Sequence, residues 1–546
     1  MNRSLGFVAV LVLSAGCAQP TRAPEIPLYD GLGSLHRTVT TDSAEAQRYF
    51  DQGLAFLFAF NHDEAIRSFR QAGELDPECA MAWWGEAIAN GPHINNPAMP
   101  PERSAAAWEA LERARRHAGR ANSVEQALIE AAGARYLAQP PEDRAALDQA
   151  YADAMAEVHR KFPEDGDVAA LYAEALMDLH PWDLYTQDGE PKSWTPPIVA
   201  LLDDTLARHP GHPLALHLYI HAVEASTDPG RADGAADRLR DLQPGLGHLV
   251  HMPSHIDVRR GRWEDAITAN TKAIAADERY RALRPQQGFY RVYMAHNAHM
   301  LAYAAMMVGR SAEAIRTMDG FVAAMPEDWK REYAWVADGY LAMPLEVRIR
   351  FGRWDEILAA PDLPAEFPVA RALRRYARGI AYASKNQPVE ARAEQRAFLE
   401  ARAAVPEDAV FGNNSALDLL AVADRLLEGE IAYREGKIDE GLQAMREGVT
   451  LEDALRYDEP PDWIHPVRHA LGASLVQAGK HAEAEAVYRA DLAKLPGNGW
   501  ALYGLSRALR AQGNSAEADE ADKQFEAAWA KADIPLRSSC FCQPGV

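Results

Sequence analysis

The spacing of small, aromatic and proline residues is the feature that most constrains how this chain folds. In the stretch YFDQGLAFLFAFNHDEAIRSFRQAGELDP, residues of these types recur at intervals that suit two helices joined by a short turn: Tyr49, Gly53, Phe56, Ala65, Phe69, Ala72 and Pro77. The small residues let the helices approach, the aromatic rings fill the space between them, and the proline closes the unit. A similar unit near the C-terminus carries Gly472, Ala484, Tyr488 and Pro496, and another follows from Trp500 to Trp529.

These spacings resemble those of the tetratricopeptide repeat (TPR), a 34-residue helix-turn-helix unit. Apolar residues fall at helical spacing almost everywhere, and Pro and Gly cluster at regular interruptions. We therefore expect an all-α fold without a sheet: a TPR-type α-solenoid of antiparallel helix pairs, wound as a right-handed superhelix from about Asp42 to Ala532.

The same pattern predicts five parts along the chain. Residues 1–27 are a signal peptide or lipoprotein tether, and residues 42–165 form N-terminal TPR-like repeats. Residues 166–330 form central His-rich repeats with a metal site, residues 331–532 form C-terminal repeats, and residues 533–546 are a tail.

The N-terminal sequence MNRSLGFVAVLVLSAGCAQP predicts export. Its apolar run is shorter than the about 20 residues that span a bilayer, and small residues follow it, as in a secretion signal. The box Leu-Ser-Ala-Gly-Cys resembles a bacterial lipoprotein cleavage site in which Cys17 is lipidated, although Ser14 replaces the usual aliphatic residue. We expect a periplasmic or membrane-anchored lipoprotein of a bacterium that contacts the membrane only through this lipid; the alternative is an ordinary cleavable signal.

Charge and cysteine content limit the partners and the chemistry. The chain has 57 Lys and Arg against 79 Asp and Glu, a net charge of −22, so phosphate backbones repel it and nucleic acid is not an expected partner. After Cys17, only Cys79, Cys540 and Cys542 remain, too few for a disulfide framework. The Cys540-Phe-Cys542 pair suits Cu(I) or oxidation, but its place near the chain end favours a frayed tail.

Histidines recur with the repeat. His217 and His221 are followed 34 residues later by His251 and His255, and nine of the 18 histidines lie between His209 and His299. If Pro244 closes a repeat, each pair falls at the fifth and ninth places of a first helix. Spacing alone puts each pair on one helix face. The TPR resemblance implies that these faces line the concave groove, together with His296 and His299 from a later unit.

Clustered imidazoles need a partner. They repel one another when protonated and leave nitrogens unsatisfied when they are buried and neutral, unless water or a cation binds them. Imidazole suits Zn, Cu, Fe and Ni. We therefore predict a transition-metal site of one or two ions, with Cu, Zn and Fe as the candidates and these ligands: His217, His221, Glu224, His251, His255, His296 and His299. The alternative is a solvated or peptide-binding polar groove.

Other residues complete the predicted groove. Glu174 is a candidate base, and Asp178, His248, Trp84 and Trp182 are expected to line the groove, with aromatic loops around Trp84 and Trp182 shielding it. The runs HLVHMPSHI, YIHAVEAS and AHNAHML are similar to those of large exported bacterial TPR proteins. Two functions stay open. One is a metal-dependent oxidoreductase or hydrolase acting on a small molecule or peptide; the other is an envelope scaffold that binds protein partners and carries at most a structural metal.

Overall fold

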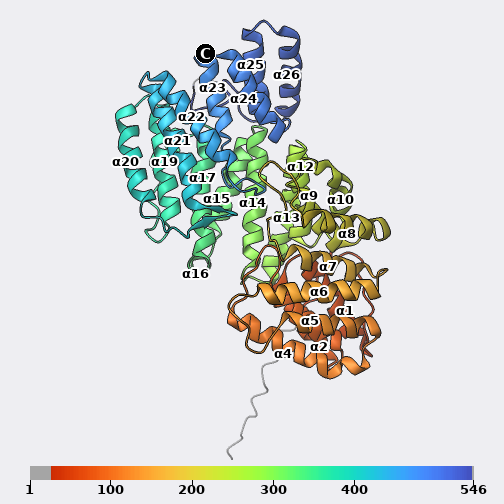
Figure 1. The fold of residues 1–546 in the computed structure, drawn as a ribbon. Coiled ribbons are helices and arrows are strands. Elements are labelled where there is room, and N and C mark those ends of the chain that lie inside the picture. Colours follow the sequence, from red (N-terminus) through yellow and green to blue (C-terminus); the bar gives the residue numbers. More distant parts are fainter. Residues whose placement is uncertain (1–25, 544–546) are drawn as a thin grey trace, which may run out of the picture.

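The computed structural model describes residues 26–543, and most of that range is helical. The chain is an all-α solenoid of TPR type in which each helix packs mainly against its neighbours in sequence (Figure 1). Residues 1–25 of the predicted signal segment, including Cys17, lie outside the described residues. Within residues 26–543, no helix is long and apolar enough to cross a membrane.

The N-terminal helices begin at capping residues. Ser43 and Asp165 each accept a hydrogen bond from the first turn of the helix that follows them, and Asn122 and Glu125 form a reciprocal capping box. The elements of this part are α1 (Ala44–Phe58), α2 (His62–Leu75), α3 (Ala80–Ala89), α4 (Pro101–His117), the 3-10 helix η1 (Ala118–Arg120), α5 (Ser123–Arg135), α6 (Ala145–Lys161), α7 (Gly166–Met177) and α8 (Thr195–Arg208).

The remaining helices complete the array. The central elements are α9 (Pro213–Val223), the 3-10 helix η2 (Pro229–Ala232), α10 (Asp233–Leu239), α11 (Gly247–His251), α12 (Pro253–Arg259), α13 (Trp263–Leu283) and α14 (Tyr290–Met307). The C-terminal helices are α15 (Ser311–Ala323), α16 (Glu327–Glu332), α17 (Ala334–Arg350), α18 (Trp354–Ala359), α19 (Pro368–Ser384), α20 (Pro388–Arg402), α21 (Ala416–Arg434), α22 (Ile438–Asp453), α23 (Val467–Gln477), α24 (His481–Lys494), α25 (Gly499–Ala511) and α26 (Ser515–Ala528).

Small residues permit the close helix packing that the repeat spacing predicts. A Cβ on Gly53 would lie 2.7 Å from the ring of Phe69, and one on Gly85 in the next helix pair would lie 2.5 Å from the same ring. The Phe69 ring of α2 therefore packs between α1 and α3. Tyr488 of α24 repeats the arrangement, since Cβ atoms on the glycines of α23 and α25 would meet its ring. The prediction for these two repeats is confirmed.

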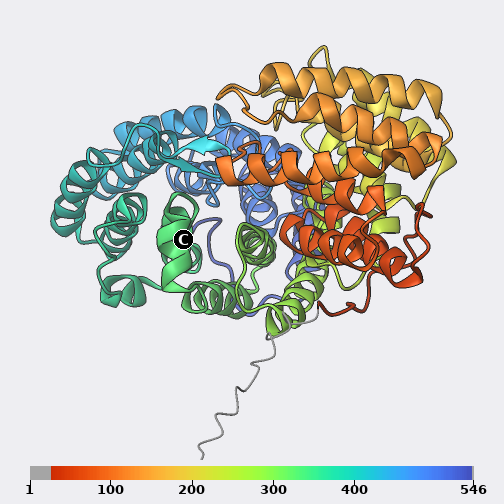
Figure 2. The same ribbon diagram turned by 90° about the horizontal axis from the view of Figure 1, so that it is seen from below.

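The buried apolar residues form two adjoining cores. The first extends from Val39 to Met294 and the second from Val258 to Cys542, so the predicted middle segment, residues 166–330, contributes to both. In Figure 2 the green-to-blue C-terminal helices form a curved wall on the left, and the red-to-yellow helices form a stack on the right. The boundary between the cores crosses α12 and α14, which places residues of these helices between the two halves.

Two expectations about the C-terminal half are corrected. The chain contains a small sheet, because β1 (Val410–Phe411) pairs antiparallel with β2 (Asn414–Ser415) around a turn in which Gly412 has a positive φ of 57°. The tail from residue 533 to residue 543 is docked, not frayed. Asp533 accepts hydrogen bonds from the amides of Ser311 and Ala312 at the start of α15, and a disulfide joins Cys540 to Cys542.

Candidate metal centre

Six histidines from three helical segments, α9, α11–α12 and α14, lie close together. α9 carries His217 and His221, and α14 carries His296. The segment between them carries three more, His248 and His251 on α11 and His255 on α12. All six rings belong to helices that pack on one another around the core boundary.

A proline shapes the middle segment. Pro253 has no N–H to donate to the preceding turn, and the helix is interrupted there between α11 and α12. The hydroxyl of Ser254 instead donates to the carbonyl of His251 over 2.7 Å. His251 and His255 lie on either side of this interruption, and their Nε2 atoms are 2.8 Å apart.

The first group of imidazoles, called trio A here, consists of His217, His221 and His248. One ring nitrogen from each lies within 4.8 Å of the other two. The Nε2 atoms of His217 and His248 are 3.1 Å apart, and the Nδ1 of His217 bonds to the carbonyl of Phe58, the last residue of α1, over 3.0 Å. The Nε2 of His221 is buried and has no hydrogen-bond partner among the described residues.

The second group, trio B, consists of His251, His255 and His296, and it meets the same distance criterion. The Nε2 of His296 lies 3.3 Å from that of His255. The Nδ1 of His251 bonds to the Oδ1 of Asn270 over 2.6 Å. Because the amide nitrogen of Asn270 donates to the Ala266 carbonyl over 2.8 Å, its oxygen is the atom that faces the imidazole.

Glu224 connects the two trios. Its carboxylate oxygens lie 2.7 Å from Nδ1 of His221 in trio A and 2.5 Å from Nδ1 of His255 in trio B. Burial alone would raise the pKa of Glu224, but the neighbouring His255 and His221 lower it to about 2. Both oxygens therefore act as acceptors for imidazole N–H groups. Each oxygen keeps a second lone pair, so Glu224 supports the rings and also remains a candidate ligand, grouped with His221 and His255.

Acceptor-only partners fix the tautomers of four rings. A carboxylate, a backbone carbonyl and an amide oxygen have no proton to give, so the Nδ1 atoms of these rings must be the donors: His217, His221, His251 and His255. In the neutral rings each Nε2 then carries a bare lone pair. The 2.8 Å separation between His251 and His255 brings two such lone pairs together, an arrangement that needs a cation or a shared proton between them.

Burial strongly favours the neutral form of four of the six rings. Burial is the largest cause that holds the pKa well below 6.5 for His217, His248, His251 and His296, and neighbouring imidazoles lower it further. Nitrogens bound to one tetrahedral ion at about 2.0 to 2.1 Å are separated by about 3.3 Å. The separations of 2.8, 3.1 and 3.3 Å between Nε2 atoms are close to that value, so each trio could hold a transition-metal ion.

A cavity of about 810 Å³ opens beside the trios. His221, Glu224 and Trp182 line it, and the ring of Trp182 stands edge-on to that of His221 at 5.3 Å. Trp182 therefore forms part of this wall of the cavity. The opposite wall comes from the loop before α23, where the Tyr457 hydroxyl lies 3.5 Å from Glu224 and 3.2 Å from Glu459. Repeat spacing did not predict this wall, because Tyr457 is more than 200 residues from Glu224 along the chain.

Four predicted residues do not join the imidazoles. His299 lies outside both trios and faces Tyr340, with ring centroids 5.9 Å apart; it is three residues, about 4.5 Å, further along α14 than His296. Asp178 instead pairs with Arg135 over 2.7 Å. Glu174 is buried near the same arginine. Burial raises the pKa of Glu174 to about 7, although the charge of Arg135 lowers it. Trp84 lies within α3 and is buried in the first core, not in a loop over the groove.

The sequence also missed an extension of the histidine cluster. His62 and His93 stack with ring centroids 4.1 Å apart, and His93 packs on Phe60, which contacts His217 at 4.4 Å. Burial lowers the pKa of His62 to about 4. His93 lies in the irregular stretch after α3, where repeat register gives no orientation.

Comparisons with known proteins give no family. No protein-family model matches the chain, and no curated protein matches it. Solved structures with some likeness include human IFIT1, in a dimer with m7Gppp-AAAA, at a TM-score of 0.34 and 12% identity over 90% of this chain and 92% of that one. A chain of the APC/C hetero-tetramer Cut9-Hcn1 gives a TM-score of 0.32 and 12% identity, covering 88% of this chain and 76% of that one. Likeness at this level carries nothing about the site.

Proposed function

We propose that the protein is a metalloenzyme with a two-ion centre, one ion held by trio A and the other by trio B. The observation that carries the proposal is the convergence of six imidazoles in two groups, four of which have their Nδ1 engaged by an oxygen acceptor and therefore carry a lone pair on Nε2. Support of this kind from a carbonyl or carboxylate is what orients metal-ligating histidines in general. Histidines in a solvated polar groove would not need such hydrogen bonds to their Nδ1 atoms.

The donor set favours copper. All six proposed ligands are imidazole nitrogens, and both oxygens of Glu224 are used by Nδ1 groups. A mixed His/carboxylate iron pair would take more of its ligands from oxygen, whereas Glu224 is the one carboxylate grouped with these histidines among the described residues, and Cu2+ binds nitrogen sites most tightly among the divalent first-row ions. Zinc is the second candidate, because it also accepts three histidines in catalytic sites.

Three ligands for each ion leave positions for a substrate. Catalytic sites commonly use three protein ligands and an open position, whereas structural zinc sites use four protein ligands. The cavity of about 810 Å³ reaches His221 and has room for a small organic molecule. A copper pair would supply redox chemistry there, so we infer an oxidoreductase acting on a small molecule; a zinc pair would favour a hydrolase.

Side chains of the chain itself would manage protons around that molecule. Burial raises the pKa of Glu459 to about 8, so this carboxyl holds a proton at neutral pH. One oxygen of Glu459 accepts from the Tyr457 hydroxyl, and the other has no partner among the described residues. We assign Glu459 as the proton donor to the bound molecule and Trp182 as the ring that covers the His221 side of the cavity.

The scaffold alternative makes an opposite prediction about the ions. In that account the solenoid binds a protein segment and the metal only stabilises the fold, so each ion is closed to outside ligands. Azide added to copper-loaded protein tests this. We expect a new azide-to-copper charge-transfer band that saturates with azide. Copper bound at both trios with no spectral response to azide would contradict the enzyme proposal and favour the scaffold.

We also propose that the protein is exported and anchored by a lipid on Cys17. The support is the short apolar core followed by small residues and a cysteine. In a bacterial host, Cys17→Ser should abolish incorporation of labelled lipid and block processing. Unchanged processing with no lipid in the parent protein would leave an ordinary cleaved signal.

A further inference from the structure

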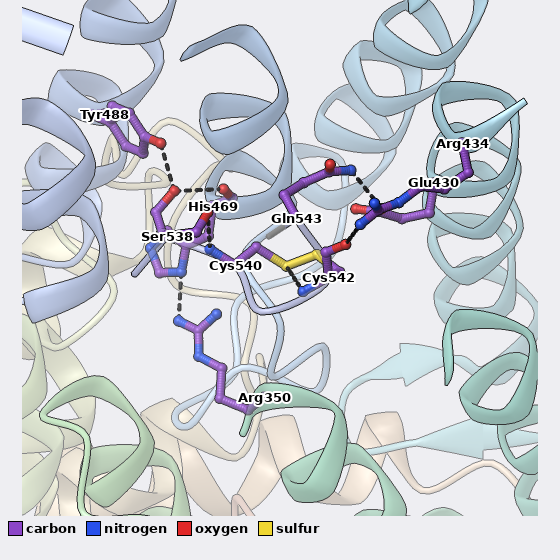
Figure 3. Close-up of a disulfide and its surroundings, with 10 residues drawn as sticks. Arg350, Glu430, Arg434, His469, Tyr488, Ser538, Cys540, Cys542 and Gln543 are labelled. Atoms are coloured by element: carbon purple, nitrogen blue, oxygen red, sulfur yellow. Dashed lines mark hydrogen bonds between the residues drawn. A yellow bond between two sulfur atoms is a disulfide. The ribbon is translucent and has the colours of Figure 1, made fainter. Parts of the chain in front are cut away.

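The docked C-terminal tail carries a second group of metal-binding atoms. In Figure 3 the Cys540–Cys542 disulfide lies between α21, which carries Glu430 and Arg434, and α23, which carries His469. The two sulfur atoms and a carboxylate oxygen of Glu430 lie within 4.8 Å of one another. None of these residues belongs to either histidine trio.

The tail is held on both sides of the disulfide. Ser539 donates to the carbonyl of His469 over 3.0 Å, and the amide nitrogen of Gln543 donates to Glu430 over 2.7 Å. Arg434 donates to the carbonyl of Cys542, and the ring of Phe541 packs edge-on against Trp500 at 5.5 Å. These contacts do not depend on the bond between the sulfur atoms. We therefore expect the tail to stay docked when that bond is broken.

The surroundings of the disulfide contain unused donor atoms. One carboxylate oxygen of Glu430 and the Nε2 of His465 are buried without a hydrogen-bond partner in the described part of the chain. Both residues line a cavity of about 30 Å³ that Cys540 and Cys542 also line. That volume has room for one water molecule or one ion. Orphaned buried polar atoms are costly, which points to a missing partner.

We propose that reduction of the Cys540–Cys542 disulfide creates a Zn2+ site with Cys540, Cys542 and Glu430 as ligands and His465 in the fourth position. Sulfur, oxygen and nitrogen donors in a set of four suit the tetrahedral preference of zinc. The oxidised tail cannot bind the ion, because each sulfur is bonded to the other. The tail is then a redox-controlled metal site, separate from the histidine centre.

The reaction balances as a thiol–disulfide exchange followed by metal binding. An external dithiol supplies two electrons and two protons, its own sulfurs become a disulfide, and the Cys540–Cys542 bond becomes two thiols. Zn2+ then replaces the two thiol protons, which pass to solvent. No other oxidant or reductant is required.

Cobalt substitution tests the proposal in the full chain, because Co2+ bound to thiolates gives a near-ultraviolet charge-transfer band that histidine sites lack. We expect reduced protein to develop this band as Co2+ is added up to three equivalents, since the two trios can take two of them, and to lose it when Zn2+ is added. Oxidised protein and the Cys540→Ser/Cys542→Ser variant, which keeps Cys79 as an internal control, should show no band. Glu430→Gln keeps both sulfurs and should weaken cobalt binding about tenfold or more, a scale that even outer-shell partners reach.

Three results would overturn the proposal. The first is a reduced protein that keeps its far-ultraviolet dichroism but gives no band. The second is an equal band in the double serine variant, which would assign the signal to Cys79. The third is full affinity in Glu430→Gln. A reduced protein that loses its helical signal also counts against the proposal, because the site requires the tail to stay docked.

Discussion

The Nε2 atoms of His251 and His255 lie 2.8 Å apart while the Nδ1 atom of each ring is engaged by an oxygen acceptor. The acceptors are Asn270 and Glu224, which hold the two rings from different helices. Two Nε2 lone pairs at this distance repel each other, so the arrangement needs a cation or a shared proton between them. In His217 and His221, too, Nδ1 bonds to an oxygen acceptor and leaves a lone pair on Nε2, and this is why we propose a second ion in trio A.

Replacing Glu224 by Gln should weaken both ions. A Gln side chain has one acceptor oxygen and one donor nitrogen, so it can accept from only one of the two Nδ1 groups that Glu224 now holds. The other ring must change its tautomer and present N–H to the metal. We expect metal affinity to fall by about 10- to 100-fold, the usual scale for such supporting residues.

A chelator competition titration measures that loss. Glu346→Gln is the matched control, because Glu346 is as buried as Glu224, at 1% exposure, and lies on α17 away from the trios. Equal affinities in the Glu224→Gln variant and the parent protein would remove Glu224 from the site.

The pH dependence of metal binding should be shallow. The pKa values of His217, His248, His251 and His296 are lowered in the folded protein, so these rings stay neutral as the pH falls through 6.5, and protons compete with metal only below the lowered values. Between pH 7.5 and 6.0 we expect affinity to change by less than about threefold. Three exposed histidines with a pKa of about 6.5 would lose about fiftyfold. A loss of that size in the competition titration would mean that the rings are solvated.

Trp182 should report copper binding at trio A. Its ring lies 5.3 Å from that of His221, and fluorescence quenching by paramagnetic Cu2+ falls steeply with distance. Although the chain has 12 tryptophans, Trp182→Phe should remove a large part of the copper-induced quenching. Trp335→Phe, at an exposed position on α17, should leave it unchanged. Equal quenching in all three proteins would place the copper elsewhere.

The repeat packing predicts opposite effects for two glycine substitutions. Gly53→Ala would bring a Cβ to 2.7 Å from Phe69 and should destabilise the fold by about 1 to 3 kcal/mol. Gly320→Ala, in α15, meets nothing within 4 Å and should stabilise it by about 0.5 to 1 kcal/mol. Urea unfolding followed by far-ultraviolet dichroism measures both. A neutral Gly53→Ala would show that the α1–α2–α3 packing is loose.

The sequence predicted most of the fold because repeat spacing is a local signal. Helix periodicity and small residues such as Gly53 identify helix pairs without knowledge of distant contacts. The 34-residue interval likewise placed His217, His221, His251 and His255 on equivalent helix faces, and their rings do lie together. Where the chain departs from the 34-residue spacing, the sequence no longer predicts which way a side chain faces.

Contacts between distant segments account for the remaining differences. Tyr457 and Glu459 reach the cavity from a loop whose position depends on the curvature of the whole solenoid, which no local pattern encodes. The role of His248 depends on the tight α11 turn before Pro253, and the docking of the Cys540–Cys542 tail depends on contacts with α21 and α23. His299 was misplaced because its position, about 4.5 Å further along α14 than His296, brings it beside Tyr340.

Metal content is the most direct test of the central claim. Protein purified without a histidine tag and loaded with copper should hold two ions per chain by elemental analysis. His251→Ala/His255→Ala should hold one, because trio B loses two of its three ligands while trio A keeps all of its own, and the helical signal should be unchanged. Parent protein that binds no stoichiometric metal, or a double variant that still holds two ions, would contradict the two-ion centre.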